Sequence, residues 1–258
     1  MEQRPDMPSK GSPTLFDRAL VRRHIARAAK HFAQHSALFD DTAEQLEQRL
    51  SEVTRTFPRA LDQSPFPFLA QDTKTPSVFS SSELQLDEEH LPVAEQSFDL
   101  IVSNLGLHWI NDVPGALAHI RAALKPDGLF LASLIGEQSL SALRACLLDG
   151  ELSITGGVSP RLSPMISLQN ASALMHRAGF HLPVADIETV TLLYTDMFAL
   201  MRDLRGMGQT NAHMERLRIP TRRAVFDKAA ALYQERFGNA DGLIPATFDI
   251  VYLHGWKQ

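Results

Sequence analysis

The segment between residues 98 and 134 constrains the fold more than any other part of the sequence. Residues 98–103 form an apolar, β-branched run of the kind that parallel sheets bury on both faces. Residues 112–124 then predict a helix with Asp112 as its N-cap, residues 125–128 predict a turn, and residues 129–134 predict the next strand. Because a strand, a crossover helix and a second strand make a βαβ unit, we expect an α/β fold with a mostly parallel sheet.

Further helices and strands are expected on both sides of this unit. Apolar residues recur at helical spacing from about residue 16 to residue 50, with Thr42 as the candidate N-cap of a second helix, and a strand at residues 56–62 ends in Asp62. Beyond the unit, the sequence predicts helices at residues 139–148, 168–178, 196–204 and 221–237, and strands at residues 181–191 and 246–256. We therefore divide the chain into a tail (residues 1–14), an N-terminal helical extension (15–55) and an α/β domain (56–258) with a helical insertion at about residues 137–235.

Composition and charge argue against several classes of protein. Hydrophobic residues make up 44% of the chain and charged residues 21%, which is typical of a globular protein, and the net charge of -5 argues against a nucleic-acid-binding protein. Cys146 is the only cysteine, so we expect no internal disulfide and no cysteine-cluster metal site. His31 and His35 have the spacing of metal ligands on a helix, but no third ligand stands near them in the sequence.

The first residues and the apolar runs of the sequence bear on where the protein is located. The first residues resemble neither a secretory signal nor a mitochondrial transit peptide, and no apolar run approaches the roughly 20 residues of a membrane span. We therefore expect a cytoplasmic protein without a membrane span.

The first predicted helix is strongly basic. Residues 15–35 contain one acid, Asp17, and carry a net charge of +4. The five cations are Arg18, Arg22, Arg23, Arg27 and Lys30. Two interpretations stay open, a solvated helix face or a docking surface for an acidic partner.

Two motifs flank the helix of the βαβ unit: Asn104-Leu105-Gly106-Leu107-His108-Trp109 and Leu124-Lys125-Pro126-Asp127-Gly128. They resemble the middle of class I S-adenosylmethionine (SAM)-dependent methyltransferases. More narrowly, the chain resembles the branch that holds the malonyl-acyl-carrier-protein methyltransferases of biotin synthesis and the complex I assembly factors that hydroxylate an arginine. The motifs that match the assembly-factor group lie at residues 15–18, 157–164, 177–180, 197–208, 245–247 and 255–257, so that the resemblance covers about residues 15–257.

The resemblance implies a Rossmann-like methyltransferase fold that binds SAM, without a metal, outside the carboxyl ends of its parallel strands. It places Asp62 at the end of the first strand, and Asp87 and Glu88 in the segment that contacts adenine, with Asp87 as the acceptor. It also assigns Ser103, Asn104 and Leu105 to the end of the strand that forms the floor of the pocket.

The glycine-rich turn of such a SAM site is missing. After Asp62 the chain runs Gln63-Ser64-Pro65-Phe66-Pro67, and no glycine occurs from Ser51 to Leu105. Glycines let the backbone approach a cofactor closely, and the two prolines also remove backbone N–H donors from the turn. Two outcomes stay open: the SAM pocket is lost, or a different loop rebuilds it.

Three further side chains are candidates for chemistry. His108 follows the predicted strand, where both a catalytic base and a packing role are open. Tyr194 is a candidate for the substrate side of the site. Arg161 stands between two Ser-Pro pairs, as a candidate for binding a carboxylate or phosphate of the substrate or for fixing its own loop.

Three hypotheses for function follow. The resemblance implies first a SAM-dependent methyltransferase that acts on a carboxyl group or a protein side chain, and therefore an enzyme. The second is a non-methylating complex I assembly factor or arginine hydroxylase, and the third is a non-catalytic scaffold, which the missing glycines favour. The partners implied are a respiratory complex I subunit or an acyl carrier protein, and a eukaryotic member would work in the mitochondrial matrix.

Overall fold

A six-stranded sheet forms the centre of the computed structural model, which describes residues 14–80, 89 and 91–258. Its strands are β1 (Ala60–Asp62), β2 (Val78–Ser80), β3 (Phe98–Asn104), β4 (Leu124–Ile135), β5 (His181–Tyr194) and β6 (Ile244–Trp256). Across the sheet they follow the order β2-β1-β3-β4-β6-β5. The first four are parallel, whereas β6 runs antiparallel to both of its neighbours. The expected α/β fold with a mostly parallel sheet is confirmed.

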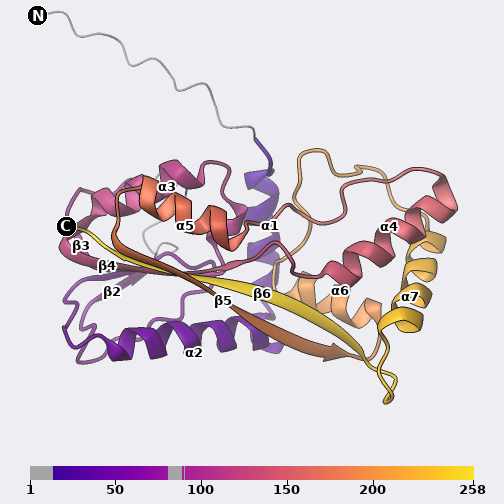
Figure 1. Cartoon of the computed structure of the whole chain (residues 1–258), viewed down its shortest axis with the longest axis horizontal. Coiled ribbons are helices and arrows are strands. Elements are labelled where there is room, and N and C mark those ends of the chain that lie inside the picture. The colour runs from indigo at the N-terminus through magenta and orange to yellow at the C-terminus, as the bar shows by residue number, and fades with distance from the viewer. Residues whose placement is uncertain (1–13, 81–88, 90) are drawn as a thin grey trace, which may run out of the picture.

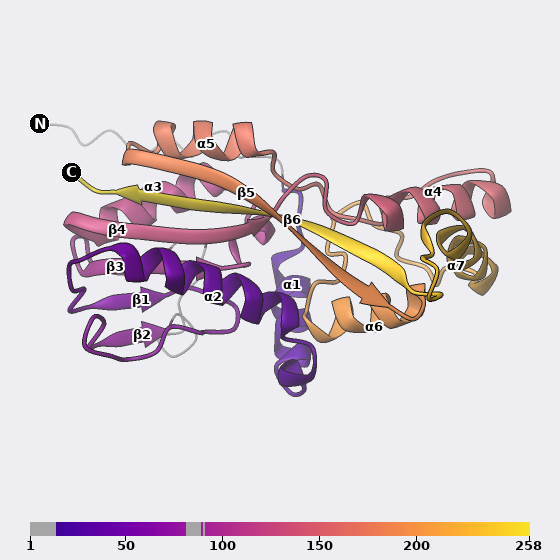
Figure 2. The ribbon, with the colours of Figure 1, turned by 60° about the horizontal axis from the view of Figure 1, so that its bottom comes forward.

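Helices cover both faces of this sheet. Figure 2 shows α2 (Ala37–Glu52) along one face, and α3 (Val113–Ala123) and α5 (Leu168–Arg177) along the other. Successive residues of a strand point to opposite faces, so β3 contributes Leu100 to the core under α2 and Ile101 to the core under α3. All residues of β3 are buried, which explains why Leu100, Ile101 and Val102 follow one another as apolar residues rather than alternating with polar ones.

Capping side chains fix where two of the helices begin. Asp17 accepts a hydrogen bond from the Leu20 N–H at the start of α1 (Arg18–Ala28), and Asp112 accepts one from the Gly115 N–H at the start of α3. The prediction of Thr42 as an N-cap was wrong, because α2 already begins after Ser36. Thr42 lies inside α2 and is completely buried.

The predicted turn at residues 125–128 was also wrong, because this stretch belongs to β4. The pairing of β4 with β3 shifts there, from Phe98 opposite Leu124 to Leu100 opposite Leu129. Asp127 has a positive φ of 59° within this irregularity. The Pro-Asp-Gly signal therefore marks a bulge in a long strand rather than a separate turn.

The remaining helices form a lobe at one end of the molecule. Figure 1 shows α4 (Ser141–Thr155), α6 (Met197–Gly206) and α7 (Arg223–Phe237) gathered at the end of β5 and β6 that is distant from the C-terminus. α4 and α7 pack closely, since a Cβ on Gly150 would lie only 2.9 Å from the carbonyl oxygen of Val225. Among the described residues, no helix is both long and apolar enough to cross a bilayer.

Candidate functional site

The carboxyl end of β1 carries Asp62, whose side chain is completely buried. Its carboxylate accepts three backbone hydrogen bonds, from the N–H groups of Ser64 at 2.9 Å, Phe68 at 2.7 Å and Leu69 at 2.9 Å. These donors all belong to the segment that directly follows β1. The chain therefore folds back around the carboxylate and uses both of its oxygens.

Asn104 ends the neighbouring strand β3 and is equally enclosed, with 1% of its surface exposed. Its Oδ1 accepts hydrogen bonds from the hydroxyl groups of Thr42, at 2.7 Å, and Ser133, at 2.6 Å. Its Nδ2 donates to the carbonyl oxygen of Phe39 at 2.9 Å, and its backbone N–H donates to Ser64 Oγ at 2.8 Å. The side chain thus ties β3 to α2, to β4 and to the segment after β1.

Residues 63–69 form a plug beside these two side chains. Phe66 stacks on Phe32 with ring centroids 3.7 Å apart and meets Phe39 edge-on at 5.4 Å. Pro65 presses against the exit of β3, because a Cβ on Gly106 would lie 3.0 Å from Pro65 Cδ. Aromatic contacts therefore hold this segment in the space where a glycine-rich turn would leave room for a ligand.

The residues assigned to SAM by resemblance do not fit an open cofactor cradle. Asp62, Ser103, Asn104 and Leu105 are each at most 1% exposed. The polar side chains of Asp62 and Asn104 are bonded to the protein itself, and Leu105 is held at a positive φ of 49°. Asp87 and Glu88 lie outside the described residues. No group of three or more potential metal ligands occurs in the described part of the chain.

His108 lies in a short 3₁₀ turn after β3 and is 6% exposed. Gln209 Oε1 lies 2.9 Å from both His108 Nε2 and Trp109 Nε1. The indole nitrogen only donates, so Oε1 is an acceptor, and His108 Nε2 must carry a proton to bond to it. Burial lowers the pKa of His108 from 6.5 to about 4, although the contact with Gln209 acts in the opposite direction. The ring is therefore neutral, and its Nδ1 is an acceptor.

Tyr194 belongs to a different network, near the end of β5 in the helical lobe. Its hydroxyl donates to Asp203 Oδ2 at 2.6 Å, and Asp203 Oδ1 lies 2.6 Å from His35 Nδ1. Burial, followed by the hydrogen bond to Asp203 and its charge, raises the pKa of Tyr194 far above the usual value for a phenol. The structure does not join this side chain to the hydrogen bonds of His108 or Asn104.

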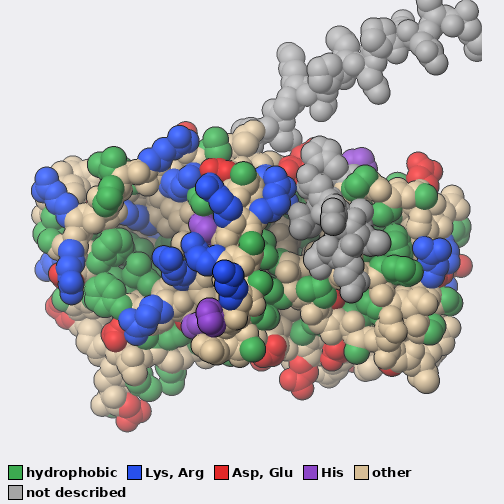
Figure 3. Space-filling model, turned by 180° about the vertical axis from the view of Figure 1, so that it is seen from behind, with side chains coloured by type: hydrophobic (Ala, Val, Ile, Leu, Met, Phe, Trp, Pro, Cys, Tyr) green, Lys and Arg blue, Asp and Glu red, His purple; other side chains and the backbone are tan. Residues whose placement is uncertain are grey.

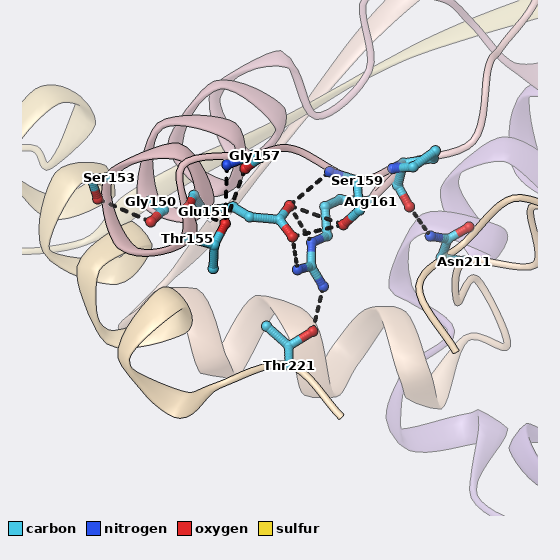
Figure 4. Close-up of polar contacts among 10 residues, drawn as sticks. Gly150, Glu151, Ser153, Thr155, Gly157, Ser159, Arg161, Asn211 and Thr221 are labelled. Atoms are coloured by element: carbon cyan, nitrogen blue, oxygen red, sulfur yellow. Dashed lines mark hydrogen bonds and ion pairs between the residues drawn. The ribbon is translucent and has the colours of Figure 1, made fainter. Parts of the chain in front are cut away.

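Arg161 makes an ion pair within the protein (Figure 4). Its Nη2 and Nε lie 2.5 Å and 3.0 Å from the two carboxylate oxygens of Glu151, and its Nη1 donates to Thr221 Oγ at 2.6 Å. Ser159 donates to the same carboxylate from its backbone N–H and its hydroxyl. Burial alone would raise the pKa of Glu151, but the hydrogen bonds from Arg161 and Ser159 leave it below the usual value. The loop after α4 is thereby tied to the segment before α7.

Several residues that build these networks were not predicted from the sequence as partners of the candidate site residues. Thr42, Gln209, Glu151 and Asp203 are separated along the chain from their partners Asn104, His108, Arg161 and Tyr194. Glu151 and Asp203 lie within ten residues of Arg161 and Tyr194, so these two pairings are local in sequence. The pairings of Thr42 with Asn104 and of Gln209 with His108 depend on how the elements pack.

Comparison with known proteins places this arrangement in a family. The family described as "Methyltransferase domain" matches residues 59–132. The mitochondrial arginine-hydroxylase NDUFAF5 of Danio rerio is 36% identical, over 96% of this chain and 84% of that protein. The malonyl-[acyl-carrier protein] O-methyltransferase of Xylella fastidiosa is 33% identical, over 94% of this chain and 88% of that protein.

The structure agrees at the level of the fold. The YcgJ protein of Bacillus subtilis superposes with a TM-score of 0.51 at 15% identity, covering 84% of this chain and 98% of that one. The chain therefore belongs to the class I methyltransferase family, in the branch that contains these arginine hydroxylases and malonyl-[acyl-carrier protein] O-methyltransferases.

Proposed function

We propose that this protein is a non-methylating member of its branch, which binds a protein partner as an assembly factor does. The observation that carries the proposal is the Asp62 carboxylate, whose oxygens are occupied by three backbone N–H groups of residues 64–69. The plug of residues 63–69 supports it. This segment takes the place of the glycine-rich turn, and the stacking of Phe66 on Phe32 holds it against the protein. We derive no methyl-transfer step from this geometry.

The charge of α1 supports a protein partner with an acidic surface. Arg22, Arg23 and Arg27 of α1 are exposed, and so is Lys30, which follows the helix. Seen from behind, Lys and Arg side chains gather over the middle of the molecule, the region of α1 (Figure 3). A basic face on a protein with a net charge of -5 favours one orientation of an acidic partner.

The resemblance supplies the two partners to test. They are a respiratory complex I subunit, as for the assembly-factor group, and an acyl carrier protein, as for the O-methyltransferases. Relatives whose names include "mitochondrial" place the eukaryotic proteins in that organelle. For this chain the proposed location is the cytoplasm, or the mitochondrial matrix if the source is eukaryotic.

A calorimetric titration of the full chain with SAM and with S-adenosylhomocysteine tests the first half of the proposal. We expect no saturable heat at ligand concentrations up to about 1 mM, the limit of weak specific binding. Saturable binding in the micromolar range would overturn the proposal. Stability of the protein during the titration is checked by a thermal melt before and after.

Copurification with each candidate partner tests the second half. We expect a complex that forms without SAM and that weakens when Arg22 and Arg23 are changed to glutamate. Lys228→Glu, at an exposed cation on α7, is the matched control and leaves binding unchanged. The mass of the partner then separates the outcomes: no change indicates a scaffold, one added oxygen indicates a hydroxylase, and one added methyl group contradicts the proposal.

A SAM-dependent methyltransferase is the second candidate. Asp62 and Asn104 favour it, because they stand at the ends of the adjacent strands β1 and β3, where the resemblance places SAM contacts. This function would require residues 63–69 to leave the Asp62 carboxylate. Micromolar binding of SAM that is lost in Asp62→Asn, while the thermal melt of that variant stays that of the wild type, would support it.

A further inference from the structure

A groove of about 470 Å³ lies on the helical lobe, between the end of α4 with the loop that follows it and the segment before α7. Ile154 and Val158 line it from the first side, and Leu217 and Ile219 line it from the second. All four side chains are exposed, Val158 by 58% and Ile219 by 69%. Neighbouring apolar side chains that remain open to water in this way mark an interaction surface.

The two sides of the groove are joined by hydrogen bonds (Figure 4). Arg161 Nη1 donates to Thr221 Oγ1 at 2.6 Å, and Asn211 Nδ2 donates to the carbonyl oxygen of Pro160 at 2.8 Å. The groove is therefore formed before anything binds in it, which lowers the entropic cost of binding.

The rim of the groove is basic. Residues 214–223 contain four arginines and one acid, on a chain whose net charge is -5. Arg218 and Arg222 are both exposed. Among the described residues that line the groove, the one acid is Glu151, which is buried and paired with Arg161. Seen from behind, the lobe shows hydrophobic side chains in patches between Lys and Arg side chains, on the left of Figure 3.

These features select one kind of occupant. A second copy of the chain would bring arginines against arginines, which is unfavourable. Sites for small molecules enclose most of their ligand, whereas Val158 and Ile219 are more than half exposed. A partner with apolar side chains for the walls and carboxylates for the rim fits both features. An amphipathic helix presents the two kinds of side chain together, with apolar residues at every third or fourth position.

We propose that this groove binds an acidic, amphipathic helix of a partner protein. The apolar side chains of that helix lie between Val158 and Ile219, and its carboxylates face Arg218 and Arg222. The inference rests on the proposed function and deepens it, because it names the structural element of the acidic partner that is bound.

Three labelled peptides of about 16 residues, long enough to form a helix when bound, test the proposal on the full chain by fluorescence anisotropy. The first consists of glutamate and alanine with leucine at every third or fourth position. The second has the same composition with its leucines distributed around the helix, and the third has lysine in place of glutamate. We expect the first to bind saturably with a Kd below about 100 µM, and the other two to bind at least about tenfold more weakly.

Matched variants locate the site. Val158→Ser combined with Ile219→Ser should weaken binding of the first peptide about tenfold, whereas Leu182→Ser, at a 65% exposed position at the start of β5, should leave it unchanged. Arg222→Glu should also weaken it severalfold, and Arg177→Glu, at an exposed cation on α5, is the control for charge. The replaced side chains are all exposed, so a thermal melt should match that of the wild type in each case.

Equal binding of the three peptides, undiminished binding in the double serine variant, or no saturable binding would each overturn the proposal. Loss of binding when Arg22 and Arg23 are changed to glutamate would overturn it too, because the peptide would then lie on α1. Sedimentation tests the other occupants. Self-association, or binding to vesicles that contain phosphatidylglycerol, that is lost in the double serine variant would assign the groove to a second copy or to a membrane.

The peptides replace both candidate partners, and SAM is absent from the assay. A negative result here therefore leaves the SAM titration and the copurification, on which the proposed function depends, unaffected.

Discussion

Replacing Asp62 by alanine tests the closed loop after β1 most directly. The substitution removes the acceptor of three backbone N–H groups, those of Ser64, Phe68 and Leu69. A hydrogen bond to a charged group contributes about 1.5–3 kcal/mol, and a buried donor left unpaired costs about as much. Ser64 is buried, whereas Phe68 and Leu69 are partly accessible to water, which replaces some of the lost bonds. We therefore expect the free energy of unfolding to fall by about 3–5 kcal/mol.

Asp72 offers a matched control in the same connection. Its carboxylate also accepts three hydrogen bonds, from the Lys74 N–H, the Thr75 N–H and the Thr75 hydroxyl, but the side chain is exposed. Water replaces part of these bonds at the exposed carboxylate, but Thr75 itself is only 1% exposed, so Asp72→Ala should cost about 1–2 kcal/mol.

Urea denaturation followed by far-UV circular dichroism measures both variants, and chymotrypsin reports on the loop, since the bond between Phe68 and Leu69 becomes cleavable when it opens. Similar losses in the two variants would refute the reasoning, because burial is the difference between them. A loss below about 1 kcal/mol in Asp62→Ala would refute it as well, since the bond from the buried Ser64 N–H alone should be worth more than that.

Variants at Phe66, His108, Glu151 and Arg161 test the remaining networks. Phe66→Ala removes the ring stacked on Phe32 and should lower the free energy of unfolding by about 2 kcal/mol in urea titrations, with no change contradicting the described packing. The pKa of His108 falls from 6.5 to about 4 on folding, so the unfolded chain binds more protons between these values and stability decreases as the pH drops through them. That loss should be about 2 kcal/mol between pH 7 and pH 5 and should be smaller in His108→Gln; equal losses in both proteins would contradict it. Glu151→Gln and Arg161→Met should each cost about 3 kcal/mol, because the first removes the counter-charge of Arg161 and the second leaves the buried Glu151 carboxylate without one. A double variant should cost less than their total. Strictly additive losses would show that the pair is not coupled.

The parts of the fold that could be predicted are those in which local pattern and burial agree. β3 is buried on both faces, so its apolar centre, Leu100-Ile101-Val102, identifies it without any knowledge of its neighbours. Asp112 caps α3 by accepting a hydrogen bond from the N–H of Gly115, three residues further along the chain, so this interaction is local in sequence. Such features need no tertiary information.

The failures come from residues whose partners are distant. Thr42 has the chemistry of an N-cap, but its hydroxyl bonds Asn104 from within α2, and only the docking of α2 on β3 makes that use visible. β2, at residues 78–80, lies in a stretch rich in breakers and has only a short pairing with β1 to define it. For the site, the sequence indicated that the glycine turn was missing, but not that Phe66 would stack on Phe32.

Arg161 shows a third kind of outcome, in which the chemistry was foreseen and the partner was not. One of the two interpretations of Arg161 was that it binds a carboxylate or phosphate of the substrate. Its guanidinium does bind a carboxylate, but this carboxylate belongs to Glu151 of the same chain. A sequence gives the binding preference of a side chain, whereas the fold decides whether an internal group satisfies it first.

The position of β6 has a consequence for how the protein is made. This strand follows every other described element in the chain, yet it lies inside the sheet, with β4 on one side and β5 on the other. Until residues 244–256 emerge from the ribosome, both of those strands present open edges, which are templates for intermolecular pairing. Closing the sheet then pairs residues as distant in sequence as Leu129 and Trp256. Contacts between such distant residues form slowly during folding. The nascent chain is therefore prone to aggregation until β6 has been made. A ribosome that stalls after α7 would leave the edges of β4 and β5 open.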